Sequence, residues 1–204
     1  MIRSGGGSPR VGRGLRVRAG CGLHVLAACF TLLAACGGAQ HAAAPPADPV
    51  RTEIERAEDA ERARQHDQAA VHYRAAIAAA RTPKQQAWAH REFAETLATW
   101  GQLPDATHEL DAAATATPDD PAIWQDLGIL RHKQADDAGA LEALGRAKQL
   151  APRDARPRIA LAALYWSTGA KPQALAEYKE LLDLDLPDRV REKVRWAIGV
   201  LEKP

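Results

Sequence analysis

Apolar residues in the second part of this 204-residue chain recur with the period of an α-helix. Between Ala87 and Thr99, for example, Phe93, Ala94 and Leu97 have the spacings that place side chains on one helix face. Glycine and proline interrupt the pattern at regular places, and no stretch alternates between apolar and polar residues as a strand does. From residue 51 onward, the pattern therefore predicts an all-α fold.

Eight positions recur at a spacing of 34 residues, which is typical of a stacked repeat array. The recurring triples are His90/Trp124/Arg158, Phe93/Leu127/Leu161, Ala94/Gly128/Ala162, Leu97/Arg131/Tyr165, Ala106/Ala140/Ala174, Leu110/Leu144/Tyr178, Ala113/Ala147/Leu181 and Pro118/Pro152/Leu186. Two of these positions hold only small residues, and two helices of a pair approach closely only where side chains are short. The period therefore predicts helix pairs that become stable by stacking on one another.

The middle copy carries a motif. Its residues are Trp124, Leu127, Gly128, Arg131, Ala140, Leu144 and Pro152. They resemble the tetratricopeptide repeat, whose signature is Trp-x2-Leu-Gly-x2-Tyr, then Ala-x3-Phe, then Pro, although Arg131 and Leu144 depart from the usual Tyr and Phe. The resemblance implies an α-solenoid of three to four antiparallel helix pairs plus a C-terminal capping helix. It also implies a groove, lined by the first helix of each pair, that binds and does not catalyse.

The repeat frame divides the chain into segments. They are a signal peptide (1–35), a lipidated cysteine with a flexible Pro/Ala linker (36–50), a degenerate repeat (51–86), three repeats (87–120, 121–154 and 155–187) and a capping helix (188–204). The degenerate copy is offset from the next by 37 residues, which predicts an insertion at Thr82-Pro83-Lys84. The last segment lacks a partner helix, and we expect it to cover the apolar face of the final repeat.

The first 35 residues contain five arginines and no acid before an apolar run, as secretory signal peptides do. The run ends in Leu33-Ala34-Ala35-Cys36, which resembles the lipobox of bacterial lipoproteins. The resemblance implies cleavage before Cys36, acylation of that residue and lasting membrane attachment. A second match at Cys29 leaves too few apolar residues after Arg18. The alternatives are a plain signal peptide cut after an alanine, or a single transmembrane anchor.

The residue after the lipidated cysteine indicates a location. Gly37 stands where the inner-membrane retention signal of many Gram-negative bacteria has Asp. We therefore expect the protein in the bacterial cell envelope, held by lipid in the outer membrane and facing the periplasm.

Composition narrows the chemistry of the mature chain. All three cysteines lie in or at the end of the leader, so the folded part has no thiol for a disulfide, a nucleophile or a metal. Five of the 27 basic residues also lie there, which leaves 22 against 26 acidic residues. This balance disfavours nucleic acid as a partner. The scattered histidines form no ligand motif. We therefore expect no enzyme activity, no cofactor and no metal.

Helical geometry indicates which side chains of the first helices face the groove. They are Trp88, Arg91, Glu95, Gln125, Ile129, His132, Lys133, Arg156 and Trp166. Trp88, Arg91 and Trp166 are candidate anchors, because Trp and Arg are enriched where binding energy is concentrated. The alternative is that the two tryptophans pack between neighbouring hairpins and that the charged residues form a solvated face. The Lys/Asn-rich carboxylate clamp of some family members is absent.

The function that these features favour is a non-catalytic adaptor or scaffold of the cell envelope, which captures a segment of a partner protein. A narrower alternative is a pilotin-like lipoprotein that assists secretin assembly. An alternative of another class is a regulatory lipoprotein that binds a small ligand or a glycan.

Overall fold

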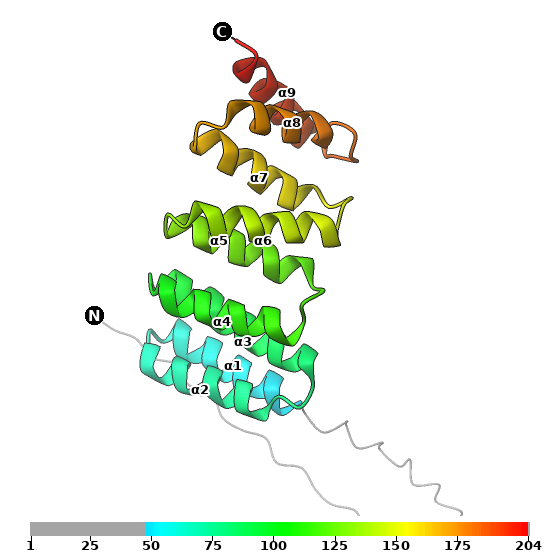
Figure 1. Cartoon of the computed structure of the whole chain (residues 1–204). Helices are drawn as coiled ribbons and strands as arrows, with labels where there is room; N and C mark the ends of the chain where they lie inside the picture. The colour runs from blue at the N-terminus through cyan, green and yellow to red at the C-terminus, as the bar shows by residue number, and fades with distance from the viewer. Residues whose placement is uncertain (1–47, 204) are drawn as a thin grey trace, which may run out of the picture. The chain divides into compact units, whose positions relative to one another are not determined.

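The computed structural model describes residues 48–203, and in that part of the chain it has nine helices and no strand (Figure 1). The helices are α1 (Pro49–Arg62), α2 (His66–Ala79), α3 (Pro83–Thr99), α4 (Leu103–Ala116), α5 (Pro121–Lys133), α6 (Asp137–Leu150), α7 (Ala155–Ser167), α8 (Lys171–Leu181) and α9 (Asp188–Leu201). The signal peptide, Cys36 and most of the linker lie outside the described residues.

The helices associate in the order of the chain. Four pairs, α1/α2, α3/α4, α5/α6 and α7/α8, form the closest contacts, and the second helix of each pair also contacts the helix that follows it. Figure 1 shows these pairs following one another from cyan to red. The predicted all-α solenoid is thus confirmed. The repeated small residues Ala94, Gly128 and Ala162 are buried on the first helices, and the recurring alanines of the second helices are buried too.

Side-chain caps fix where several helices begin. Asp48, Thr82 and Asp120 each accept a hydrogen bond from a backbone N–H of the next helix, and a proline follows each of them. Proline is suited to a first helical turn, where its missing donor is not needed. The predicted linker, which ended at residue 50, is therefore too long. Asp48 caps α1, and Val50 is 0% exposed, so these residues belong to the folded domain.

The 37-residue offset also has a structural explanation. Helix α3 has 17 residues, whereas α5 and α7 have 13 each. The predicted insertion at Thr82-Pro83-Lys84 adds about one turn to the start of α3, and the helix begins before Ala87. The added turn contacts the preceding repeat, because the Gln85 side-chain amide donates to the Asp48 carboxylate at 3.2 Å. The insertion therefore extends a helix instead of interrupting one.

Each helix pair turns through one residue with a left-handed backbone conformation. These residues are Arg64, Gly101, Ala135 and Gly169, with φ between 59° and 80°. Each of them follows the C-cap residue of the first helix of its pair, and in three of the turns the next N–H donates to a carbonyl of the last helical turn at 2.8–2.9 Å. This is the geometry of a Schellman cap, which favours glycine. Two of the four turns have no glycine to relieve the strain.

Substitutions in these turns should have opposite effects. Ala135→Gly should raise the free energy of unfolding by about 1 kcal/mol, because an alanine in this conformation is strained. Gly101→Ala should lower it by a similar amount, and a Cβ there would meet no atom within 4 Å, so only the backbone sets the cost. Chemical denaturation of the mature protein measures both values. A loss of stability in Ala135→Gly would contradict this explanation.

The position of Trp124 in the repeat holds an ionisable residue, Glu53, His90 or Arg158, in the other three pairs. Each of these residues bonds to a side chain 19 residues later on the second helix: Glu53–His72, His90–Glu109 and Arg158–Glu177. The residue 19 positions after Trp124 is Ala143, which is fully buried. An indole beside a methyl group in one pair, and a hydrogen-bonded pair of ionisable side chains in the other three, thus occupy equivalent places. The equivalence includes α1 and α2, whose sequence matches the repeat motif poorly.

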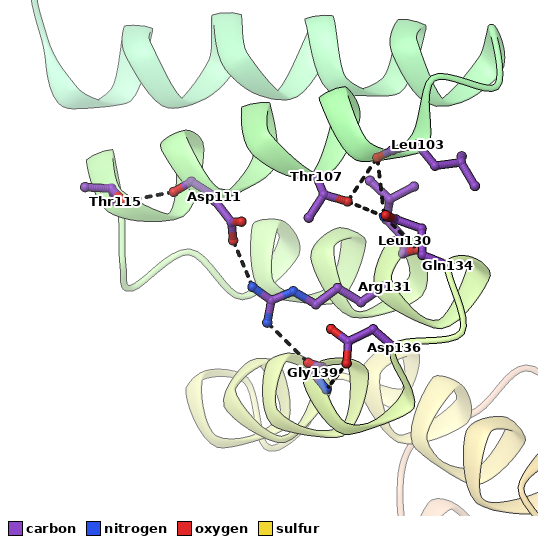
Figure 2. Close-up of polar contacts among 9 residues, drawn as sticks. All are labelled: Leu103, Thr107, Asp111, Thr115, Leu130, Arg131, Gln134, Asp136 and Gly139. Atoms are coloured by element: carbon purple, nitrogen blue, oxygen red, sulfur yellow. Dashed lines mark hydrogen bonds and ion pairs between the residues drawn. The ribbon is translucent and has the colours of Figure 1, made fainter.

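Arg131, which replaces the usual tyrosine of the motif, connects three helices (Figure 2). Its guanidinium donates to Asp111 on α4 at 3.0 Å and to the Gly139 carbonyl on α6 at 3.4 Å. Asp136 caps α6 by accepting from the Gly139 N–H, and a Cβ on Gly139 would lie 2.2 Å from the Asp136 carboxylate. The departure from the motif therefore comes with its own partners, an aspartate and a glycine.

Helix α9 covers the end of the last pair. Val194 and Ala197 on α9 are buried, and Val194 belongs to one apolar cluster with Leu181 and Leu186. This is the role that the sequence predicts for a capping helix. Trp196, on another face of α9, remains 66% exposed.

Candidate peptide-binding groove

A hollow of about 300 Å³ lies between α3 and α5. Its lining residues are Arg91, Ala94, Glu95, Ala98, Leu110, Asp126, Ile129, Leu130 and Lys133. Helix α1 packs against α3 and α5 packs against α7, but α3 and α5 make little contact with each other. This gap between the first helices of two repeats reaches down to Leu110 on α4. We call it the α3/α5 hollow.

The α3/α5 hollow has an apolar floor. Ala94, Leu110 and Leu130 are buried, and Ala98 is partly buried. Ile129 is one of the few large apolar side chains of the described residues that are exposed, at 38%. Covering an apolar side chain stabilises a complex by about 25 cal/mol for each Å² removed from water. The floor can therefore hold an apolar side chain of a partner.

An ion pair crosses the hollow. Arg91 on α3 donates from Nε to Asp126 on α5, with an N–O distance of 2.7 Å. Burial by itself would lower the pKa of Arg91, but the hydrogen bond and charge of Asp126 outweigh it and raise that pKa above its ordinary value. Arg91 is therefore already paired with a carboxylate of the protein, which weakens its attraction for a carboxylate of a partner.

A second, smaller hollow of about 210 Å³ lies between α1 and α3, with α2 beneath it. Its lining residues are Glu58, Glu61, Tyr73, Glu92, Glu95, Thr96 and Thr99. We call it the acidic hollow. Glu95 lines both hollows, so they adjoin. The Thr96 hydroxyl donates to the Tyr73 oxygen at 3.0 Å, and the Tyr73 hydroxyl donates to Glu61 at 3.1 Å. Burial raises the pKa of Tyr73, so the phenol stays neutral at physiological pH.

Glu92 carries its charge at a cost. Burial raises the pKa of this carboxyl, and the charge of Glu95 raises it further, while the hydrogen bond from the Trp88 indole at 2.9 Å lowers it. A carboxyl whose pKa is higher in the folded than in the unfolded protein binds its proton more tightly when folded. The ionised carboxyl therefore lowers stability at neutral pH, and this cost disappears as the pH falls below the unfolded pKa.

Removing this charge should stabilise the protein in a pH-dependent way. Glu92→Gln keeps an acceptor oxygen for Trp88 and should raise Tm at about pH 7 but have little effect at about pH 4. Thermal unfolding at both pH values tests this, with Glu142→Gln as the control because Glu142 is an exposed glutamate on α6. Equal effects of Glu92→Gln at the two pH values would contradict the cost assigned to the buried charge.

The structure brings four of the predicted groove residues together. Arg91, Glu95, Ile129 and Lys133 line the α3/α5 hollow. Trp88 lies at a neighbouring hollow of about 500 Å³ that it shares with Arg91. The Trp88 ring is partly covered by the Arg51 guanidinium, whose carbon lies 5.5 Å from the ring centre. Of the predicted anchors, Arg91 thus lies in the α3/α5 hollow itself, and Trp88 lies in the neighbouring hollow.

The other predicted groove residues lie elsewhere or have partners of their own. Gln125 is partly buried and lines neither hollow, and His132 bonds to Asp137 at 2.6 Å. Arg156 bonds to Asp154, the cap of α7. Trp166 packs against Tyr178 and Trp196, with ring centres 6.0 Å and 6.1 Å away. For Trp166 the structure therefore favours the alternative, packing between neighbouring helices.

Sequence reasoning missed part of the site. Asp126 was not predicted because its partner Arg91 lies 35 residues away, one residue off the repeat period. Glu58 could have been found, because it precedes Glu95 by the same 37-residue offset that relates the first two turns. Glu92 could also have been found, because Asp126 occupies the equivalent place 34 residues later.

Two further features are absent from residues 48–203. No three or more histidine, cysteine or acidic side chains gather there in a way that would hold a metal ion. None of the helices described is both long enough and apolar enough to cross a membrane.

No family model matches the chain. A stretch of 74 residues is 34% identical to the human (Homo sapiens) PEX5-related protein and covers 36% of this chain and 12% of that protein. The chain therefore corresponds to a small part of that protein.

Solved structures share the arrangement of the helices. The MamA protein superposes with a TM-score of 0.62 at 17% identity, over 76% of this chain and 81% of that one. A tetratricopeptide repeat protein from Parabacteroides merdae has a TM-score of 0.64 at 16% identity, over 76% and 59%. YrrB, described as a TPR protein with an unusual peptide-binding site, has a TM-score of 0.57 at 18% identity, over 73% and 74%. The chain is thus an all-α repeat protein with the tetratricopeptide fold, as the motif around Trp124 predicts.

Proposed function

We propose that this protein is a non-catalytic adaptor that holds a segment of a partner protein in the α3/α5 hollow. The observation that carries the proposal is the combination of an apolar floor, the exposed Ile129 and the Arg91–Asp126 pair in one gap between two first helices. The likeness to YrrB, whose structure is described as having a peptide-binding site, supports a peptide as the ligand.

The second part of the proposal is the anchor. Cleavage before Cys36 and acylation of that residue would retain the domain at the bacterial envelope, at the outer membrane and facing the periplasm. Residues 37–47 would tether it to the lipid. If so, Cys36→Ala should move the protein from the membrane fraction to the soluble fraction on fractionation of the cells. Continued membrane association of the variant would contradict the anchor.

Co-isolation of partners tests the binding surface. Ile129→Glu places a charge on the exposed apolar side chain of the α3/α5 hollow, and it should deplete the partner recovered from detergent-solubilised envelopes. Val71→Glu is the matched control, because Val71 is a 59% exposed apolar residue on α2 that lines neither hollow. Equal recovery with both variants would contradict the proposed site.

A further inference from the structure

The acidic hollow lacks a positive charge within the described part of the chain. It is lined by four glutamates and by no lysine or arginine. Glu61, Glu92 and Glu95 form no ion pair in residues 48–203, and Glu58 has only the exposed Arg62 at 4.0 Å. Arg91, the nearest cation of α3, is engaged by Asp126. Like charges held together at a partly buried place repel one another, and the raised pKa of Glu92 agrees with this.

The adjoining α3/α5 hollow has a different character. Two cationic residues, Arg91 and Lys133, line it together with Glu95 and Asp126, Arg91 and Asp126 form an ion pair, and the floor is apolar. The two hollows therefore differ in what they can accept: a cation fits between α1 and α3, and an apolar side chain fits between α3 and α5. Because Glu95 lines both, one short segment can occupy both at the same time.

We infer that the segment captured by this groove is basic: it carries a lysine or arginine that enters the acidic hollow and, a few residues away, an apolar side chain that enters the α3/α5 hollow. This inference rests on the proposed function and adds the chemistry of the partner. An ammonium or guanidinium group would offset the repulsion among the glutamates and would find acceptors in the carboxylates and in the Thr99 hydroxyl. An acidic segment would add to the repulsion.

The segment approaches in a fixed direction. Its basic residue lies toward α1 and its apolar residue toward α5, because the carboxylates without cationic partners are on α1 and α3 and the exposed Ile129 is on α5. Complementary charge mainly determines specificity and the rate of association, and its contribution weakens with salt. The apolar contact supplies affinity that salt does not remove.

The test uses an array of nine-residue peptides and the full-length mature protein in detergent. One set has a single Lys or Arg and a single Leu at spacings of one to four residues in a Gly/Ser background. Matched sets have Glu in place of the basic residue, or Leu alone. The basic set should bind, the Glu set should bind at least about tenfold more weakly, and added salt should reduce the difference.

Protein variants separate the two hollows. Glu58→Gln with Glu95→Gln removes two exposed carboxylates and should weaken the basic peptides by about tenfold while leaving Leu-only peptides unchanged. Glu142→Gln with Glu192→Gln changes the net charge equally at exposed glutamates outside both hollows, and it should change nothing. Ile129→Ser should weaken every peptide that binds.

The failures of the two proposals are distinguishable. If Ile129→Ser weakens binding but Lys and Glu peptides bind equally, the proposal that the groove captures a protein segment remains supported, and the inference that the segment is basic is overturned. If the Glu58/Glu95 variant and its control have the same effect, the acidic hollow is not the subsite. If no peptide binds, or if Ile129→Ser leaves the affinity of every peptide unchanged, both proposals are overturned.

Discussion

Glu177→Ala should lower the free energy of unfolding by about 2 kcal/mol, because it removes the buried carboxylate that the partly buried Lys148 and Arg158 share. Glu177 is only 9% exposed and accepts from Lys148 on α6 at 2.6 Å and from Arg158 on α7 at 3.3 Å. These contacts join the last two helix pairs. The Nε of Arg158 is itself buried without a hydrogen-bond partner among residues 48–203, so this guanidinium already pays a desolvation cost.

Two controls isolate the buried charge. Glu180 also bonds to Arg158 but is 54% exposed, so Glu180→Ala should cost at most about 1 kcal/mol. Replacing all three members, by Lys148→Met, Arg158→Met and Glu177→Leu, should restore most of the stability that Glu177→Ala removes, because no unpaired charge remains. Denaturant titration gives the three values. Equal losses for Glu177→Ala and Glu180→Ala would contradict the assigned importance of burial.

Gly128→Ala should lower the free energy of unfolding by about 2 kcal/mol, although alanine favours helices by about 1 kcal/mol over glycine. An added Cβ would lie 2.6 Å from the Leu144 Cγ and 3.2 Å from the Ala140 carbonyl oxygen. Neither atom can move freely, because Leu144 is 1% exposed and Ala140 is fully buried. The helices α5 and α6 would therefore have to separate.

Gly145 on α6 provides the matched control for this substitution. A Cβ there meets no atom within 4 Å, so Gly145→Ala should raise the stability by roughly 0.5–1 kcal/mol. Leu144→Ala removes the clashing atoms, so Gly128→Ala should cost less in that background than in the wild type. A stabilising Gly128→Ala would show that the close approach of α5 and α6 is wrong.

The repeat structure was predictable because it depends on local periodicity. The recurring small residues, the helix pairs and the capping helix all follow from spacings within the sequence, and the structure places them as expected. Details that depend on single caps were less predictable. The start of α1 was missed because Pro49 and Val50 look like the end of a proline-rich linker until the side chain of Asp48 is seen to cap the helix.

The groove was predictable only in part. Helical geometry gives the exposed side of each first helix, and four of the residues expected there, Arg91, Glu95, Ile129 and Lys133, line one hollow in the structure. It does not give the distance between neighbouring first helices, which decides where a hollow opens. Nor does it give the partner of a tryptophan: Trp166 is covered by Trp196, which lies on a helix outside the repeat frame.

Photo-crosslinking in the native cell tests the central claim most directly. A photoreactive amino acid at position 129 would lie on the α3/α5 hollow, and the same group at position 71 would lie on the exposed side of α2. We expect one discrete crosslinked partner from position 129 and none of that species from position 71. The same species from both positions, or none from position 129, would contradict capture of a protein segment between α3 and α5.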